Sequence, residues 1–302
     1  MTLEAFVKAT IRAKELGFFE IRLHEDSIQN LYHLLLYPGY RIDTWLVDKE
    51  INSDLRDSFK EIIATFPLLT NGELIENELY ERSEFHKEIN NVKLRVYGLG
   101  AAHVYGTLSV SLLTHEEWLK TNVSIQHYAI DHEANETTLE VNTLNFSSKQ
   151  TLELHINWIE NEQKESLKKS IDLWSRREEY FPNIILGTDI ENQFKKIGLT
   201  KKLNQVFDSL KKLDSYAKTW VQGGFNLNAL KDSSLMDISG ESACTMQKYS
   251  TLRKFRLANG QKAQFELHIK IPQVRIYFLP DEETHKITVG YIGKHIRTCL
   301  FD

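Results

Sequence analysis

A stretch toward the end of the chain, residues 251–295, constrains the fold more than any other part of the sequence. Apolar residues occupy every second position of its first long run: Phe265, Leu267, Ile269 and Ile271. A period of two is typical of a half-buried strand. The alternation resumes at 274–278 and again at 287–291, and Asn259-Gly260 upstream has the character of a hairpin turn. The pattern therefore predicts four short antiparallel strands joined by tight turns.

One face of this predicted sheet is apolar, and the other displays charged and aromatic side chains. The residues expected on the second face are Glu266, His268, Lys270, Arg275 and Tyr277. Charged residues alternate outward on any half-exposed sheet, so this face could be solvated surface without a function. The same side chains could instead bind a phosphate and transfer a proton without a metal. The spacing alone leaves both interpretations open.

The formal net charge of −5 conceals a division between two parts of the chain. Residues 183–302 contain 18 Lys and Arg against 12 Asp and Glu, a net of +6, whereas residues 1–182 carry a net of −11. A basic segment beside an acidic one indicates a polyanion-binding module attached to a part that would not itself bind a polyanion.

Membrane, cofactor and cysteine signals are weak throughout the sequence. The longest apolar runs are far shorter than a membrane span, and the first residues follow an amphipathic helical pattern rather than that of a signal peptide. We therefore expect a cytoplasmic chain without a membrane partner. The cysteines, Cys244 and Cys299, lie neither in a CxxC pair nor beside histidines at metal-ligand spacing. The sequence thus predicts no disulfide scaffold, no metal site and no cofactor.

The chain as a whole is expected to adopt an α+β fold with three regions. Residues 1–150 alternate helical patterns with strand-like runs, including one at 40–47, and predict an acidic α+β domain with a mixed or antiparallel sheet. Within it, 71–91 is polar and predicts a loop or exposed helix. Residues 151–182 predict a charged helical connector. Residues 183–302 predict a strand near 183–187, helices at 190–197 and 201–220, and then the antiparallel strands.

The order of elements in 183–302 resembles the RelE/HigB-like toxin fold, in which two helices pack against one twisted antiparallel sheet. The likeness includes an LRxxRL-like strand at 252–257, an RIxYF-like run at 274–278, and a final GYIGKH at 290–295. It covers about 120 of the 302 residues and leaves the first 180 unexplained. Members of this family are typically metal-independent endoribonucleases that cut mRNA, often on the ribosome. The resemblance thus implies an RNA-cleaving toxin or defence effector, with RNA or the ribosome as partner and an antitoxin or trigger protein as a further one.

Such a reaction needs few groups from the protein, because RNA supplies its own nucleophile, the 2′-hydroxyl. It requires a base for that proton, an acid for the leaving 5′-oxygen and cations for the charged intermediate. His268 or Glu266 could be the base, and His295 or Tyr277 the acid. The acidic region would restrain or target the module.

Other predicted contacts to RNA are basic or aromatic. Phosphate could be stabilised by four cations: Lys254, Arg256, Lys270 and Arg275. Tyr277 or Tyr291 could stack on an unpaired base, and Lys294 is a further nucleic-acid contact. Family members differ in which residue is the base, so the resemblance does not fix these roles.

Two other functions remain open at the level of sequence. The C-terminal sheet could be a non-catalytic module that binds nucleic acid or a protein, within an adaptor or sensor. Alternatively, the chain could be a metal-dependent DNA nuclease of an antiphage system, although that chemistry requires converging carboxylates that the sequence does not clearly supply. The oligomeric state is not indicated by any pattern.

Overall fold

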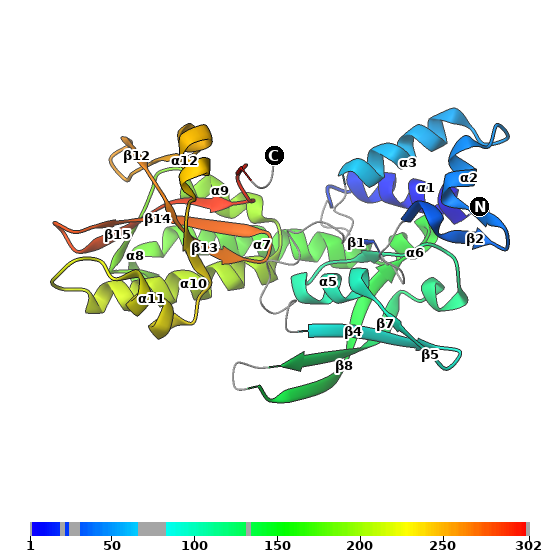
Figure 1. Ribbon diagram of the computed structural model, residues 1–302, viewed down its shortest axis with the longest axis horizontal. Coiled ribbons are helices and arrows are strands. Elements are labelled where there is room, and N and C mark those ends of the chain that lie inside the picture. Colours follow the sequence, from blue (N-terminus) through cyan, green and yellow to red (C-terminus); the bar gives the residue numbers. More distant parts are fainter. Residues whose placement is uncertain (1, 19–21, 24–30, 66–82, 131–133, 300–302) are drawn as a thin grey trace. The chain divides into compact units, whose positions relative to one another are not determined.

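The computed structural model describes residues 2–18, 22–23, 31–65, 83–130 and 134–299 (Figure 1). The chain divides into two compact units, Met1–Glu160 and Asn161–Asp302. Each unit combines helices with antiparallel or mixed sheets, which confirms the predicted α+β class. The division falls inside helix α7 (Ile156–Ser175), within the stretch that was expected to connect the two halves. None of the described helices has both the length and the apolar composition needed to cross a bilayer.

The N-terminal unit is built on a six-stranded sheet with the order β1-β6-β8-β7-β4-β5. Its strands are β1 (Arg22–Leu23), β4 (Ser83–Ile89), β5 (Val92–Arg95), β6 (Ser109–Val110), β7 (Asn122–Ile130) and β8 (Glu136–Phe146). The pairs among β5, β4, β7 and β8 are antiparallel, and β6 is parallel to both β1 and β8. The accompanying helices are α1 (Thr2–Glu15), α3 (Ser53–Thr65), α5 (Tyr97–Tyr105) and α6 (Lys149–Glu153). This mixed sheet agrees with the sequence-based prediction.

Two local predictions in this unit were wrong. The strand expected at 40–47 is instead a short strand, β3 (Tyr40–Arg41), followed by helix α2 (Ile42–Val47). Ile42 and Trp45 are the buried residues of α2, and they lie three positions apart, on one face of a helix. Of the expected loop or exposed helix at 71–91, residues 83–89 form β4, and 71–82 lie outside the described residues.

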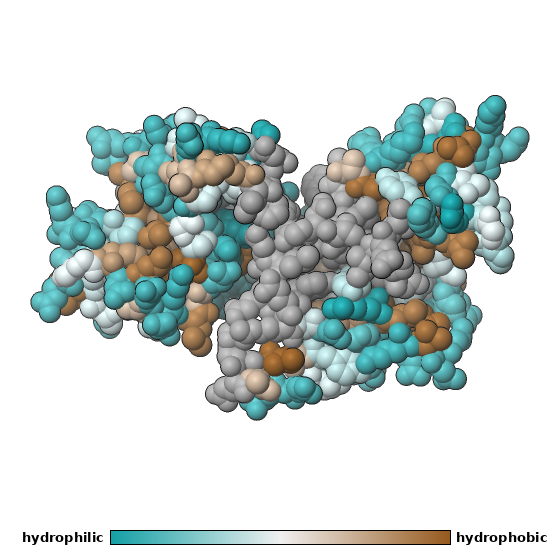
Figure 2. Space-filling model, in the orientation of Figure 1, coloured by the Kyte–Doolittle hydropathy of each residue, from teal (hydrophilic) through white to brown (hydrophobic). Residues whose placement is uncertain are grey.

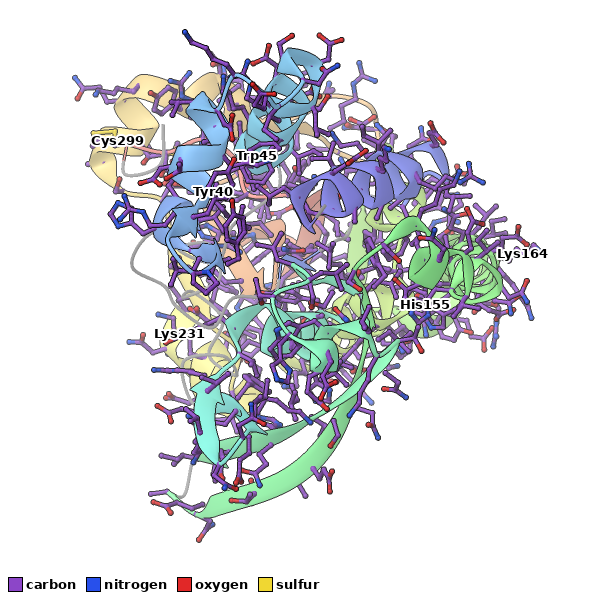
Figure 3. The ribbon with its side chains drawn as sticks, turned by 90° about the vertical axis from the view of Figure 1, so that its right-hand side faces the viewer. Tyr40, Trp45, His155, Lys164, Lys231 and Cys299 are labelled. Carbon is purple, nitrogen blue, oxygen red and sulfur yellow. A yellow bond between two sulfur atoms is a disulfide. The ribbon has the colours of Figure 1, made fainter. Side chains whose placement is uncertain are left out.

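The junction between α6 and α7 is fixed by a buried histidine. His155, labelled in Figure 3, places its Nε2 2.9 Å from the backbone oxygen of Asn145 at the end of β8. His155 is only 7% exposed. Helix α7 therefore begins from a defined point on the sheet of the N-terminal unit.

The C-terminal unit contains a five-stranded sheet with the order β10-β13-β14-β15-β9. Its strands are β9 (Ile184–Leu186), β10 (Ile238–Gly240), β13 (Leu267–Ile271), β14 (Val274–Asp281) and β15 (Lys286–Gly293). All neighbouring pairs are antiparallel except β15–β9, which is parallel. The predicted strand near 183–187 and both predicted helices are present, the latter as α9 (Ile190–Ile197) and α10 (Thr200–Thr219), and α11 (Leu227–Ser234) follows them.

Helices cover the apolar face of this sheet. Helix α10 buries residues spaced three or four apart, the period of one helix face: Leu203, Val206, Leu210 and Leu213. These residues form one core with apolar strand residues such as Ile269 and Ile276, which are 0% exposed. The apolar half of the predicted alternation is thus the main core of this unit.

The opposite face of the sheet is covered as well, by α12 (Ala243–Tyr249), η3 (Ser250–Arg253), and the hairpin formed by β11 (Lys254–Arg256) and β12 (Lys262–Gln264). Figure 1 shows α12 and β12 on the other side of the strands from α10 and α11. The predicted continuous run at 265–271 is interrupted before β13. Phe265 is 0% exposed and packs against Phe255 and Gly290, where a Cβ at Gly290 would lie 2.4 Å from its ring. The alternation placed Phe265 in the same core as Ile269, whereas in the structure it lies outside the helix-covered core.

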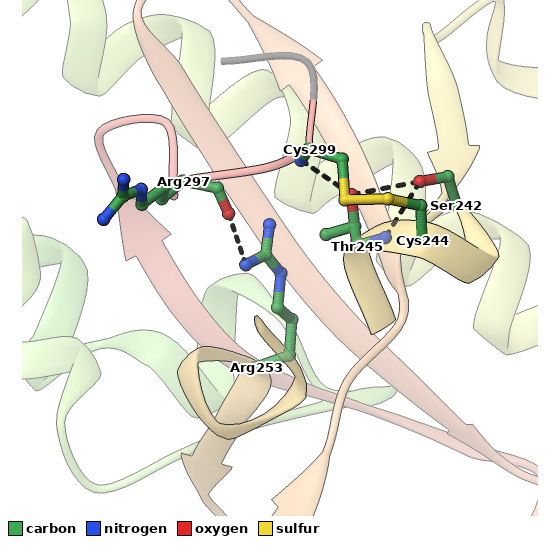
Figure 4. Close-up of a disulfide and its surroundings, with 6 residues drawn as sticks. All are labelled: Ser242, Cys244, Thr245, Arg253, Arg297 and Cys299. Carbon is green, nitrogen blue, oxygen red and sulfur yellow. Dashed lines mark hydrogen bonds between the residues drawn. A yellow bond between two sulfur atoms is a disulfide. The ribbon is translucent and has the colours of Figure 1, made fainter. Parts of the chain in front are cut away.

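A disulfide fastens the end of the described chain to α12 (Figure 4). Cys244 and Cys299 form this bond across a separation of 55 residues, which corrects the expectation that the chain has no disulfide. Cys299 N also donates to Thr245 Oγ1 at 3.3 Å. The spacing gave no sign of the pairing, because it results from tertiary contacts. We call residues 294–299 the tail.

Loss of this disulfide is expected to lower the free energy of unfolding by about 2–4 kcal/mol, because the bond restricts the unfolded chain. The measurement is urea unfolding of the wild-type protein with and without dithiothreitol. Cys244→Ser/Cys299→Ser is the control and should unfold at one midpoint under both conditions. An unchanged wild-type midpoint in reductant would contradict the prediction.

Candidate functional site

The structure brings four predicted site residues together on the face of the C-terminal sheet that α12 and the hairpin cover. In the antiparallel pair β13–β14, His268 lies directly opposite Tyr277, and Lys270 lies opposite Arg275. The rings of His268 and Tyr277 are 4.9 Å apart between centroids. Side chains directly opposite each other are the closest cross-strand neighbours in a sheet. The four residues thus form two adjoining cross-strand pairs.

This face is not displayed to solvent, contrary to the sequence-based expectation. His268, Arg275 and Tyr277 are only 7%, 4% and 1% exposed, and the Lys270 side chain is 27% exposed. Alternation correctly separated the two faces of the strands. It could not show that α12, η3, the β11–β12 hairpin and the tail would pack over the polar face.

The centre of the site is a buried carboxylate, Glu241, whose side chain is 4% exposed. Its Oε1 accepts hydrogen bonds from Arg253 Nε at 3.0 Å and from the Tyr277 hydroxyl. The same oxygen lies 3.9 Å from His268 Nδ1. We call these four residues, Glu241, Arg253, Tyr277 and His268, the Glu241 cluster.

Arg253 links the cluster to the tail and is 0% exposed. Its Nη1 donates to the carbonyl of Arg297 at 2.6 Å (Figure 4). Its Nη2 donates to the carbonyl of Ile296 at 3.4 Å. A buried guanidinium requires a counter-ion and filled hydrogen bonds, and here Glu241 and the two carbonyls provide them. The tail is therefore held by both a disulfide and a buried arginine.

Sequence reasoning gave no role to Glu241 or Arg253. One signal for Arg253 was present, since Arg253, Phe255 and Leu257 alternate with the exposed Lys254 and Arg256. That period of two indicates that Arg253 shares the inward side with Phe255. Glu241 had no comparable signal, because its partners are far away in the sequence.

Tyr277 is a weaker candidate for the acid than the sequence suggested. Burial, together with its hydrogen bond to Glu241, raises the pKa of the Tyr277 phenol well above its usual value. The hydroxyl proton is committed to the Glu241 carboxylate, and the ring is enclosed. Tyr277 is therefore placed to orient Glu241 rather than to donate to a leaving group or to stack on a base.

His268 has the properties of a neutral imidazole. Burial is the main cause that lowers its pKa to about 4, and nearby cations lower it further, while Glu241 acts in the opposite direction. Nε2 lies 3.2 Å from Ser239 Oγ, and Nδ1 has no hydrogen-bond partner among the described residues. The ring is therefore neutral near pH 7, and its buried Nδ1 has a lone pair or a proton that no hydrogen bond occupies.

The depressed pKa of His268 predicts a pH-dependent stability. Between pH 6.5 and pH 4 the unfolded chain, with a histidine pKa near 6.5, binds a proton at this residue that the folded chain does not bind. The contribution of His268 to the free energy of unfolding is therefore complete above pH 6.5 and is lost as the pH falls toward 4. The loss from this residue should be roughly 3 kcal/mol. Urea unfolding of wild type and His268→Asn at pH 7 and pH 4.5 measures it. The variant should lose less stability than wild type, and equal losses would contradict the prediction.

The remaining catalytic candidates lie around the cluster. Lys270 Nζ is 3.8 Å from Asp237 Oδ2, and Arg275 Nη1 donates to the carbonyls of Ile271 and Val274 at 3.4 and 3.3 Å. His295 is half-buried in the tail. The charges of Arg275, Lys270 and His295, in decreasing order of effect, lower the pKa of His268.

The other predicted residues lie further from the cluster or serve the packing. Glu266 is exposed in the break before β13, so His268 is the better candidate base of the two. Tyr291 stacks on Phe255 with ring centroids 5.0 Å apart, and its hydroxyl donates to Lys294 O at 2.9 Å. That ring face is therefore occupied rather than open to a base.

The basic residues predicted to bind nucleic acid are on the surface. Lys254 and Arg256 extend from β11, and Lys294 lies in the tail; all three are exposed. Arg256 Nη1 is 3.7 Å from Asp189 Oδ1, an exposed pair. In the parts of the chain that the structure describes, no three His, Cys, Asp or Glu side chains converge in a way that could hold a metal ion.

Comparisons with protein-family models, with curated proteins and with solved structures found no match to this chain.

Proposed function

We propose that the C-terminal unit is a metal-independent endoribonuclease of the RelE/HigB kind, used as a toxin or defence effector. The observation that supports it most is the pairing of a neutral imidazole, His268, with cations on the same sheet face and in the tail. A base that is unprotonated near pH 7 and adjoins phosphate-binding groups is what cleavage of RNA by its own 2′-hydroxyl requires.

In the proposed reaction, His268 Nδ1 takes the proton of the 2′-hydroxyl as that oxygen attacks the adjacent phosphorus. The bond from phosphorus to the 5′-oxygen breaks, and His295 donates a proton to the departing oxygen. Lys270 and Arg275 stabilise the negative charge of the pentacoordinate intermediate. The products are a 2′,3′-cyclic phosphate and a 5′-hydroxyl.

Access to this site is through its less buried edge. Lys270 and His295 are partly exposed, whereas the side chains of the Glu241 cluster are covered. A phosphate would contact these two residues first, and the tail would have to shift for the ribose to approach His268. In the cytoplasm, the location we propose, thiols are kept reduced. There the tail would lose its covalent link and keep only non-covalent contacts, such as those to Arg253 and Thr245, which would ease this movement.

The proposed role of the acidic N-terminal region is to restrain or target the ribonuclease. Residues 1–182 carry a net charge of −11, which would repel RNA and favour a basic partner surface. RNA or the ribosome is the proposed substrate partner, and an antitoxin or trigger protein would regulate access.

A second candidate function is RNA or protein binding without catalysis. The near-complete burial of Arg275 and Tyr277 favours it. The Tyr277 ring packs in the interior, and the Arg275 guanidinium donates to a backbone carbonyl. The exposed basic residues on β11 would then be the functional ones.

One experiment separates these functions. Purified protein is incubated with RNA, DNA and translating ribosomes, with and without EDTA. RNA fragments that form equally in EDTA support the ribonuclease. Salt-sensitive RNA binding without fragments favours the binding module. DNA fragments that EDTA abolishes would contradict both and indicate a metal-dependent nuclease.

A further inference from the structure

The β11–β12 hairpin has two chemically different sides. Phe255 packs inward against Tyr277 and Tyr291, with ring centroids 5.3 and 5.0 Å apart. The cations that flank it, Lys254 and Arg256 on β11, and Lys262 on β12, are all exposed. Figure 2 shows mainly hydrophilic residues around this hairpin. Alternation along a strand places Lys254 and Arg256 on one side, about 7 Å apart.

Two of these cations stand directly opposite each other, because Arg256 pairs with Lys262 in the antiparallel register. Like charges directly opposite each other destabilise a pair of strands. Asp189 is 3.7 Å from Arg256 but offers a single carboxylate in a pair that is about half exposed. The hairpin therefore carries a positive charge that its own neighbours only partly offset.

The hairpin is held against the sheet. A Cβ added at Gly187, just after β9, would lie 2.2 Å from the backbone oxygen of Arg256, so the two backbones are in close contact. Phe265 N also donates to Arg253 O at 2.9 Å, which closes the base of the hairpin. A backbone supported in this way needs no rearrangement to present the cations, which favours affinity.

We infer that the outward side of this hairpin, defined by Lys254, Arg256 and Lys262, is a docking surface for the phosphate backbone of single-stranded RNA. The inference rests on the proposed function and identifies the element that holds the substrate. The ligand that fits this surface is a polyanion of repeating phosphates, because three cations lie close together on two neighbouring strands and the aromatic residue between Lys254 and Arg256 faces inward. It thus binds the RNA strand without reading its sequence.

The test uses an unstructured 2′-O-methyl uridine oligonucleotide, which cannot be cleaved through a 2′-hydroxyl. Its affinity is measured across a range of salt concentrations for wild type and for Lys254→Ala/Arg256→Ala/Lys262→Ala. Each phosphate contact on a single strand contributes about 0.7 to the slope of log affinity against log salt, so the variant should lose about 2 from that slope. Lys212→Ala/Lys218→Ala/Lys286→Ala removes the same charge from exposed sites elsewhere in the unit and is the control.

The inference is supported if the hairpin variant loses slope and affinity while the control keeps both and the thermal midpoints agree. An unchanged slope for the hairpin variant, or an equal loss in the control, overturns it. Cleavage of unmodified RNA is scored separately. Wild type that binds through the hairpin but leaves RNA intact would contradict the ribonuclease alone. If wild type cleaves RNA but the salt slope of the hairpin variant equals that of wild type, the docking surface alone is contradicted.

Discussion

Glu241→Ala is expected to lower the free energy of unfolding by about 3–5 kcal/mol, because it removes the counter-ion of a buried guanidinium. Arg253 is 0% exposed and its Nε lies 3.0 Å from Glu241 Oε1, so without the carboxylate its charge stays buried and unpaired. The Tyr277 hydroxyl loses its acceptor in the same change. Urea unfolding at pH 7 followed by circular dichroism measures the loss.

Two further variants make this prediction specific. Glu266→Ala removes an exposed carboxylate from the neighbouring segment and should stay within about 0.5 kcal/mol of wild type. Glu241→Ala/Arg253→Met removes both buried charges and should be more stable than Glu241→Ala alone, because an apolar side chain then replaces the unpaired cation. A Glu241→Ala protein as stable as Glu266→Ala would refute the buried ion pair.

The second large effect is on RNA cleavage. His268→Ala is expected to reduce the rate by about 10²–10⁴-fold, the usual contribution of a positioned general base, while RNA binding is retained. Rates are measured on a fluorescently labelled RNA with enzyme in excess. His268→Asn is assayed in parallel, since it keeps a polar side chain opposite Tyr277 and separates loss of the base from loss of packing.

His285→Asn is the matched control for histidine removal. His285 lies in the turn between β14 and β15 with φ 54, a conformation that asparagine tolerates. It should cleave RNA at the wild-type rate. If His285→Asn and His268→Ala lose activity equally, or if neither does, His268 is not the base.

The sequence was informative about which side chains share a face and less so about what covers that face. Alternation in 265–278 placed His268, Lys270, Arg275 and Tyr277 on one face. The β13–β14 register pairs His268 with Tyr277 and Lys270 with Arg275. Burial of that face depends on segments distant in sequence. Because alternation describes only one strand's two sides, it cannot distinguish solvent from a second layer of chain.

The partners of the site were hidden for the same reason. Glu241 reaches Tyr277 across 36 residues, and Cys244 reaches Cys299 across 55, and neither separation leaves a local pattern. Short apolar runs were a separate source of error. Ile42 and Trp45 fit a strand as readily as a helix until their burial three positions apart identified a helix.

We propose that the C-terminal unit cleaves RNA through the 2′-hydroxyl and without a metal. The most direct measurement compares one RNA with its 2′-O-methyl counterpart in EDTA and identifies the ends of any fragments by mass spectrometry. We predict that wild type cuts only the unmodified RNA and leaves 2′,3′-cyclic phosphate and 5′-hydroxyl ends. Intact RNA, or fragments of the methylated strand bearing 5′-phosphates, would contradict it.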